Sequence, residues 1–410
     1  MQSMIKTTVL AGLLFAAPAV MHAQFDFKVD GLPVQVHSFL SQGFAYSNDN
    51  NYLTMKTSAG SFDFSDLGVN ASTNLTDKFR VGAQFYTRNV GHLGEWTPTL
   101  DWAMADYKFK DWFGVRGGKV KTTLGLYNDT QDMEFLHTWA LLPQSVYPLD
   151  TRGDTIAHIG GDIYGNIAVK RAGTLAYTLY GGKRPDDLQG GYVYSLDTVQ
   201  GGTQTTSLPT NRAVTSYGGP TWGADLRWIN PVKGLTVGAS FLNADITTRG
   251  YFKANDAPYE RITLKDNMPA YYVDYTIWNF KFDAEYRKEN KTTDGTSITR
   301  IWNAVTSYDL RMGYASAAYR VSKRLELGTY YTRYYPNYAP PFHSLPANHE
   351  FDNAISARID LTSYMDFKIE GHFIDGNPVG NALRGFYSQN NPLGVAPTTR
   401  ALVLRLGYHL

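Results

Sequence analysis

The sequence predicts an all-β protein, a transmembrane antiparallel up-and-down β-barrel of about sixteen strands. Three observations predict this fold. Apolar and polar residues alternate along many segments of about ten residues, which gives each segment one apolar and one polar face. The segments come in pairs joined by short turns. Long polar stretches separate one pair from the next, as expected for a barrel with short turns at one end and long loops at the other.

Composition excludes several classes of protein. The chain has 410 residues, no cysteine and a formal net charge of +1. Without cysteine it has neither a disulfide framework nor thiol chemistry. Because its 38 basic and 37 acidic residues nearly balance, the chain lacks the basic surplus of a nucleic-acid-binding protein, and no nucleic-acid partner is expected.

The N-terminal segment predicts a secretory signal peptide over residues 1–23, followed by one barrel domain over 24–410. Lys6 gives the segment a charged start, Val9 to Ala17 form an apolar centre, and small residues follow. We place cleavage after Ala23, with cleavage after Ala19 as the alternative. Since no later run reaches about 18 apolar residues, no helix is expected to cross a membrane.

Seven hairpins are predicted in chain order. In the first of them, Leu75 precedes a Thr-Asp-Lys turn, after which Phe79, Val81, Ala83 and Phe85 share one face. All seven show the same alternation, and they lie at 74–85, 99–117, 159–181, 222–241, 271–287, 313–331 and 355–373. One strand over 34–46 precedes them, and one over 400–410 closes the chain.

Eight polar stretches, rich in Gly, Asn, Asp, Thr and Pro, have the composition of loops. They lie at 47–60, 88–97, 118–156, 182–219, 243–268, 288–308, 334–350 and 375–397. Only about ten residues separate the expected cleavage site from the first strand, which leaves no room for an N-terminal plug domain.

The apolar faces could meet inside a soluble sandwich or propeller, or they could contact lipid. Lipid is favoured because almost no charged residue occupies a position on the apolar face of a strand. A Lys or Arg on that face costs about 2–4 kcal/mol at the bilayer midplane. Aromatic residues near strand ends are typical of interfacial girdles, and they are Phe79, Trp112, Phe113, Trp228, Trp278, Phe280, Tyr319 and Tyr364. A sheet in lipid has no free edge, so the first and last strands are expected to pair.

The final residues, "ALVLRLGYHL", alternate to the end of the chain and resemble the last strand of Gram-negative outer-membrane barrels. The family's terminal residue is typically Phe, and here it is Leu410. With the signal peptide and about sixteen strands, the chain resembles a trimeric diffusion porin. The resemblance implies an outer-membrane location, a homotrimer, and a water-filled channel for passive diffusion of small hydrophilic solutes. A substrate-selective channel for sugars or small anions is the alternative.

The stretch 118–156 is the third long loop, and "RGGKVKTTLGLYND" and "LPQSVYP" are similar to the corresponding region of porin families. In those proteins this loop folds into the barrel and constricts it. Loop carboxylates facing wall guanidiniums would place a transverse field across the constriction. The candidate constriction residues are Arg80, Arg88, Arg116, Lys119, Lys121, Asp129, Asp132, Glu134, Asp150, Arg152, Asp154 and Arg405.

Two strands carry opposite charges two residues apart on the polar face, which suits the wall of an aqueous lumen. These ladders are Lys281, Asp283, Glu285 and Arg287 on one strand and Asp366, Lys368, Glu370 and His372 on the other, and Arg358 adds a charge on the strand that precedes the second ladder. Strict alternation places Lys119 and Lys121 on the opposite face of the strand from Arg116. A β-bulge at Gly117 and Gly118 is expected to turn both lysines inward. The loop aromatics, among them Trp139, either anchor the loop to the inner wall or form a track for sugars.

No catalytic motif, metal-ligand spacing or cofactor-binding loop occurs in the chain, so neither enzyme activity nor a cofactor is expected. A barrel enzyme with Ser, His and Asp side chains gathered at the rim is the alternative. Membrane lipids and copies of the same chain are the expected partners. Small outward residues at Ala71, Ala83, Ala103 and Ala105 would allow close contact between barrels, and the loop 88–97 could reach into a neighbour.

Overall fold

The structure is a computed structural model, and it describes residues 25–29, 31–198, 212–253, 256–297, 303–338, 342–378 and 384–410. The expected signal peptide lies outside these residues. Among the residues described, none of the helices is both long and apolar enough to cross a membrane.

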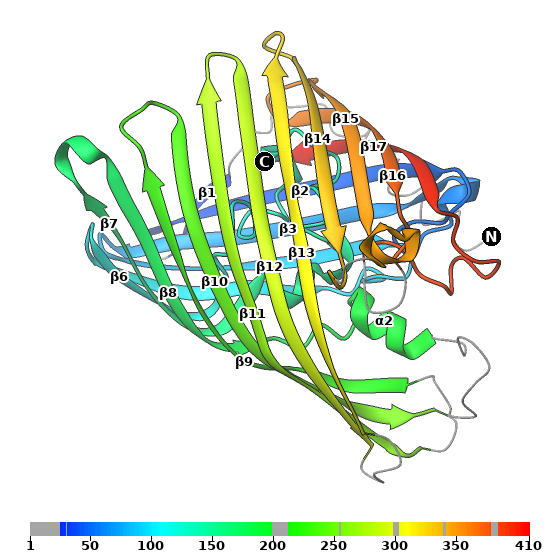
Figure 1. The fold of residues 1–410 in the computed structure, drawn as a ribbon. Coiled ribbons are helices and arrows are strands. Elements are labelled where there is room, and N and C mark those ends of the chain that lie inside the picture. The colour runs from blue at the N-terminus through cyan, green and yellow to red at the C-terminus, as the bar shows by residue number, and fades with distance from the viewer. Residues whose placement is uncertain are drawn as a thin grey trace.

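Sixteen strands form one closed antiparallel barrel in which each strand pairs with its neighbours in the sequence (Figure 1). The last strand pairs with the first of the sixteen over nine residue pairs, from Ala401 and Ser47 to His409 and Phe39. The strands are β2 (Leu32–Ser47), β3 (Ser61–Thr76), β4 (Phe79–Val90), β5 (Thr99–Lys110), β6 (Phe113–Lys121), β7 (Ala157–Ala168), β8 (Thr174–Arg184), β9 (Arg212–Ile229), β10 (Leu235–Phe252), β11 (Pro258–Ile277), β12 (Phe280–Ser297), β13 (Asn303–Arg320), β14 (Leu325–Tyr335), β15 (Glu350–Asp360), β16 (Met365–Asp375) and β17 (Thr398–His409). The predicted closed barrel and all seven hairpins are confirmed.

One further strand, β1 (Phe25–Val29), was not predicted. It pairs with the start of β2, where Phe25 lies opposite Val36. The backbone of Leu410 exchanges hydrogen bonds with Ser38, two residues further along β2. The strands β1 and β17 therefore follow one another along the same edge of β2.

The few helical segments lie in turns and loops. The α-helix α2 (Gly191–Thr198) follows β8 and lies near one rim of the barrel (Figure 1). The 3₁₀ segments are η1 (Thr57–Ala59), η2 (Glu134–Leu136), η3 (Leu149–Asp154), η4 (Lys170–Ala172), η5 (Phe342–Ser344) and η6 (Pro346–Asn348).

Two of the predicted loops are wrong. The stretches 243–268 and 288–308 are mostly strand, because β9 to β13 each have 18 to 20 residues. About 9–11 residues suffice to cross a bilayer, so these strands continue beyond it. Water lies on both faces of a projecting strand, and outward positions there carry charges such as the ion pair of Arg249 with Glu260 at 2.7 Å. The apolar half of the alternation therefore disappears, although the strand continues.

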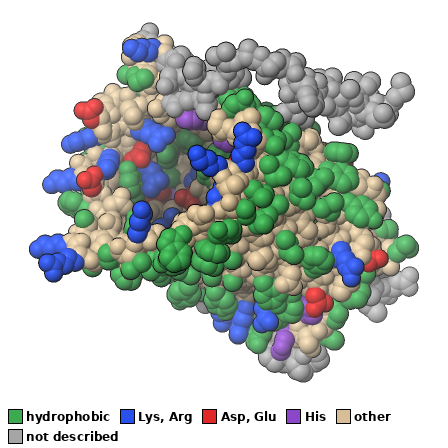
Figure 2. Space-filling view, turned by 90° about the horizontal axis from the view of Figure 1, so that it is seen from above, with side chains coloured by type: hydrophobic (Ala, Val, Ile, Leu, Met, Phe, Trp, Pro, Cys, Tyr) green, Lys and Arg blue, Asp and Glu red, His purple; other side chains and the backbone are tan. Residues whose placement is uncertain are grey.

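The two faces of each strand differ as the alternation predicts. On β9, Trp222 and Leu226 point outward with 54% and 52% of their surface exposed, whereas Asp225 between them is buried. Figure 2 shows that the outer surface is largely hydrophobic and that a hollow on the viewed face contains basic and acidic side chains. The predicted girdle residues lie at the short-turn end, where Trp278 in the turn between β11 and β12 is 87% exposed. The outward face therefore suits lipid.

Replacing an outward residue at mid-strand by a cation tests this orientation. We expect Ala224→Arg to lower the free energy of unfolding in lipid vesicles by about 2–4 kcal/mol, because Ala224 lies on the outward face five residues before the short-turn end of β9 and the guanidinium would lie near the bilayer midplane. The matched change Val232→Arg, in the turn before β10, should cost at most about 1 kcal/mol. Equal effects in urea unfolding would show that the outward face of β9 does not contact the hydrocarbon core.

Candidate functional site

The segment 122–156, which joins β6 to β7, contacts strands on all sides of the barrel. Its residues hydrogen-bond to inward side chains of β4, β12, β14, β16 and β17. It also packs apolar side chains against the inward faces of β13 and β14, where the Trp139 ring meets Tyr330 edge-on at 5.0 Å. We call this segment the inner loop.

The first anchor joins the inner loop to β16 and β17. The Lys368 ammonium lies 2.5 Å from the Glu134 carboxylate, and both side chains are nearly fully buried. Glu370 accepts hydrogen bonds from the backbone N–H groups of Ala140 and Leu141, each at 3.0 Å. One further contact comes from β17, where Arg405 donates to the carbonyl oxygen of Ala140 at 2.9 Å. These contacts fix the middle of the loop to the wall.

The second anchor lies on β12. The Tyr127 hydroxyl donates to Asp283 at 2.6 Å, and the Tyr147 hydroxyl donates to Glu285. Arg287 donates to the carbonyl oxygens of Leu124 and Val146 at 3.0 and 3.3 Å. Lys281 donates to the Tyr127 oxygen at 2.8 Å. The predicted β12 ladder thus binds the loop through four successive inward side chains.

The third anchor lies on β4 to β6. Asp132 accepts from Gln84 at 2.6 Å and from Lys121 at 2.8 Å. Arg152 makes a two-pronged contact with Asp101 at 3.0 and 2.7 Å. Sequence reasoning missed Asp101, because strict alternation places it outward. A bulge in the pairing of β4 with β5 beside Gln84 reverses its direction.

The bulge predicted at Gly117 and Gly118 is wrong. Both glycines pair one-to-one with β5, although Gly118 has a φ of 126° that disfavours any other residue. Lys121 reaches Asp132 from the end of β6. Lys119 donates to the carbonyl oxygen of Leu100 at 2.6 Å. No bulge is needed, because long lysine side chains reach these acceptors from the strand end.

Burial and ion pairing set the charges of the inner loop. Burial raises the pKa of the Asp132 carboxyl, but Lys121 and Arg152 outweigh this effect and hold the pKa below its usual range. Glu134 behaves in the same way beside Lys368. Burial lowers the pKa of His137 to about 3, so its imidazole is neutral. Asp132 and Glu134 therefore stay ionised at neutral pH.

Other predicted constriction residues do not meet the inner loop, or meet only its ends. Arg80 donates to Ser72 Oγ at 3.0 Å. Arg116 lies over the Tyr164 ring at 4.2 Å. Arg88 donates to a backbone carbonyl oxygen in η3, the last helical segment of the loop.

The last turn of the inner loop, η3, meets another loop and the strand β9 at the same rim. Asp150 accepts from Tyr387 at 2.8 Å. Asp154 accepts from the Tyr217 hydroxyl at 3.0 Å, and burial with the nearby Asp187 carboxylate raises the pKa of Asp154 to about 6. Burial likewise raises the pKa of Asp129, whose backbone oxygen accepts from Lys121 at 2.9 Å.

On β15 and β16, Arg358 donates to the carbonyl oxygens of Phe135 and His137 at 2.7 and 2.9 Å. Asp366 lies 3.4 Å from Lys368 and 3.8 Å from Arg358. The loop carboxylates Asp132 and Glu134 thus lie in direct contact with wall cations, in contrast to the facing arrangement that we expected from the sequence.

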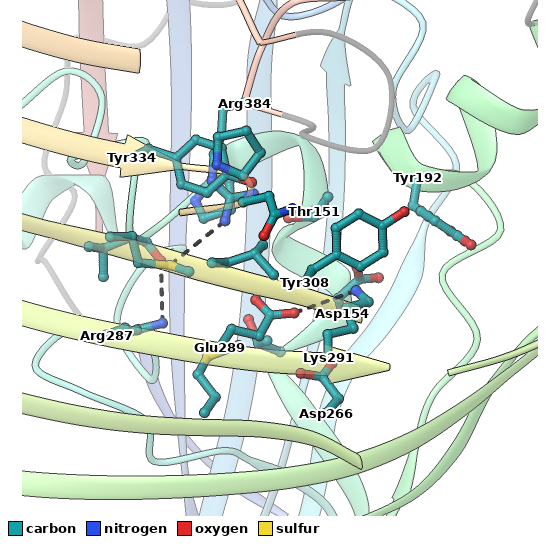
Figure 3. A pocket seen from close by; sticks show the side chains of 18 of the residues that line it. Thr151, Asp154, Tyr192, Asp266, Arg287, Glu289, Lys291, Tyr308, Tyr334 and Arg384 are labelled. Atoms are coloured by element: carbon teal, nitrogen blue, oxygen red, sulfur yellow. Dashed lines mark hydrogen bonds and ion pairs between the residues drawn. The ribbon is translucent and has the colours of Figure 1, made fainter. Parts of the chain in front are cut away.

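Two cavities lie against the inner loop, one on its long-loop side and one on its short-turn side. One of about 340 Å³ lies towards the long-loop rim between the loop, α2 and β10 to β14 (Figure 3). Its charged side chains include Arg184, Asp266, Glu289, Lys291 and Arg384, none of which was predicted. Glu289 and Lys291 continue the β12 alternation, so the signal was present in the sequence within a stretch assigned to a loop. The other cavity, of about 570 Å³, lies at the short-turn end beside Phe135 and Arg324.

One group of buried side chains, around His158, resembles a catalytic triad. The His158 imidazole bonds to Asp162 at 2.8 Å and to the Thr122 hydroxyl at 3.0 Å, which resembles the order of a catalytic triad. Thr122 and His158 are 2% and 1% exposed, and neither lines a described cavity, so a substrate cannot reach the hydroxyl. Among the described residues, no group of three or more His, Cys, Asp or Glu side chains could hold a metal ion.

The chain has the fold of the sixteen-stranded outer-membrane porins of Gram-negative bacteria. Salmonella typhi OmpF, solved in complex with daunomycin, matches with a TM-score of 0.55 and 10% identity over 94% of this chain and 100% of that one. The anion-selective porin from Comamonas acidovorans matches with 0.52 and 11% over 92% and 99%. The outer membrane channel DcaP of Acinetobacter baumannii matches with 0.52 and 12% over 94% and 99%. No protein-family model and no curated protein matches the sequence.

The contact between Lys368 and Glu134 can be tested by a double-mutant cycle. Lys368→Met leaves the Glu134 carboxylate buried without its partner, and we expect it to lower the free energy of unfolding by about 3–5 kcal/mol. Adding Glu134→Leu should recover much of this loss, because the uncompensated charge is removed. Urea unfolding measures both, with Lys78→Met in an exposed turn as the control. Strictly additive losses would contradict the contact.

Proposed function

We propose that this protein is an outer-membrane porin, exported with its signal peptide removed, which lets small hydrophilic solutes diffuse through a water-filled channel. The observation that carries the proposal is the inner loop. It is held from within by three groups of buried polar contacts, and a cavity lies on each side of it, towards the long-loop rim and towards the short turns. A loop in this position narrows a sixteen-stranded barrel, which is otherwise wide enough for an aqueous channel.

The proposal includes no enzyme activity and no cofactor. The grouping closest to a catalytic one, around His158, lacks a reachable nucleophile. The polar side chains on both sides of the inner loop suit water and dipolar solutes, since fixed charges of both signs line the cavity between the loop and the long-loop rim. A near balance of these signs favours a channel with weak ion selectivity.

Planar-bilayer recording tests the channel. The purified full chain should give ohmic conductance steps. Replacing residues 126–148 by a short Gly-Ser linker should enlarge each step, because this part carries the contacts that hold the loop across the lumen. The control, Leu393→Ser, changes an exposed residue of another loop and should leave the steps unchanged. A folded protein without conductance would contradict the proposal, and measured hydrolase activity would favour the enzyme alternative.

We further propose that the barrel assembles as a homotrimer through β3 to β5. The outward side of these strands has a shallow groove of about 520 Å³, lined by small residues that include Ala71, Ala83, Ala103 and Ala105. Small outward side chains allow the surfaces of two barrels to approach closely.

Filling the groove tests this assembly. We expect Ala83→Trp to convert trimers to monomers in mild detergent, because the indole would fill the groove. Light scattering with size-exclusion chromatography measures the mass. Ala224→Trp on the outward face of β9 is the matched control and should stay trimeric. A monomeric unmodified protein would overturn the proposed trimer.

A further inference from the structure

The cavity between the inner loop, α2 and β10 to β14 is lined by charged and by apolar side chains, whereas a passage for purely polar solutes needs only polar ones. In Figure 3, Asp154, Lys291 and Asp266 lie at one end, and Arg384 and Tyr334 lie at the other. Cationic and anionic groups therefore line one space of about 340 Å³, which is large enough for a small organic molecule.

One end of the cavity presents charges of both signs close together. On β12, Lys291 lies 3.4 Å from Glu289. Asp266 lies on the neighbouring strand, since Asn267 pairs with Asn290 beside a register shift in β11. A solute that reaches this end meets an ammonium group and a carboxylate on adjacent strands.

Asp266 lacks a full set of hydrogen bonds. Its side chain is 2% exposed, and its Oδ1 atom has no hydrogen-bond partner among the described residues. A buried carboxylate oxygen without a donor is costly, whereas a donor from a bound molecule would satisfy it. By comparison, the carboxylate of Asp154 accepts from Tyr217. Asp266 therefore points to a ligand with a donor, and a cationic donor makes the strongest such bond.

Part of the remaining wall is apolar. Leu242 and Ile246 from β10, Met268 from β11, and Leu310 and Met312 from β13 line the cavity on both sides of the β12 charges. These positions are on the inward parity, where a lumen wall that contacts only water would carry polar side chains. An apolar group of a bound solute that displaces water from such side chains is stabilised by the hydrophobic effect.

We propose that this cavity binds a zwitterionic solute with an apolar body, namely an apolar amino acid or a dipeptide of such residues. The ammonium group binds Asp266, the carboxylate binds Lys291, and the side chain packs against Met268 and its aliphatic neighbours. The inference rests on the proposed channel for the solute's entry, and it adds the class of solute that the channel selects.

Calorimetric titration of the folded full chain in detergent tests the proposal with free phenylalanine as the probe. Three analogues each lack one feature: 3-phenylpropionate lacks the ammonium group, phenethylamine lacks the carboxylate, and glycine lacks the apolar body. We expect phenylalanine to bind about tenfold or more tightly than each analogue, because one charge-assisted hydrogen bond is worth roughly that factor. Equal or tighter binding of 3-phenylpropionate, or no binding of phenylalanine, would overturn the proposal.

Variants locate the site. Asp266→Asn keeps the shape and should weaken phenylalanine binding about tenfold while leaving 3-phenylpropionate binding unchanged. Met268→Ser should weaken both. Arg171→Gln, in the exposed turn before β8, is the matched control and should change neither. An Asp266→Asn protein that binds phenylalanine normally would contradict the assignment. Calorimetry measures binding independently of conductance. A protein that conducts but does not bind phenylalanine would contradict only this inference. A protein that binds phenylalanine but does not conduct would contradict only the proposed channel.

Discussion

A strand that crosses a bilayer has to satisfy each of its backbone N–H and C=O groups through neighbouring strands, because the hydrocarbon core offers no water. This constraint determines the architecture. The sheet closes where β17 pairs with β2, and β1 extends the pairing along the β2 edge beyond Leu410. Closure in turn separates two media, so each strand needs one apolar face and one polar face. The period of two follows from the same requirement.

Once the barrel is closed, the charged side chains of the wall lie in its interior. The inner loop brings peptide groups and carboxylates into that space, and the wall meets them with inward side chains such as Glu370 and Lys368. Apolar contacts such as the one between Trp139 and Tyr330 add to this attachment. The anchors leave a cavity on each side of the loop, and the cavity near Asp266 has charges of both signs beside aliphatic side chains. The anchoring residues and the proposed solute-binding residues Asp266, Lys291 and Met268 are thus different side chains of one lumen.

Alternation predicted the barrel, its hairpins and the direction of most side chains, because lipid forces an apolar face wherever a strand is immersed. It failed where the strands extend beyond the membrane, so the prediction assigned Glu289 and Lys291 to a loop. It also failed at Asp101, because no residue nearby in the sequence indicates the bulge that turns this side chain inward. The sequence indicated that Asp132 and Glu134 lie in the inner loop, but not that Gln84 and Lys368 bind them, because these partners lie 48 and 234 positions away and meet the loop only once the barrel has formed. The helix α2 has only eight residues, too few for a helical pattern.

The central claim is that neighbouring residues on one strand face lipid and lumen in turn. The chain contains no cysteine, so single cysteines can be placed at the small residues Ala315, Ser316, Ala317 and Ala318 of β13 and labelled with a fluorophore. In vesicles of brominated lipid, we predict strong quenching at Ala315 and Ala317, whose side chains point outward, and little at Ser316 and Ala318, which are buried. Uniform quenching, or none at any of the four positions, would contradict the account.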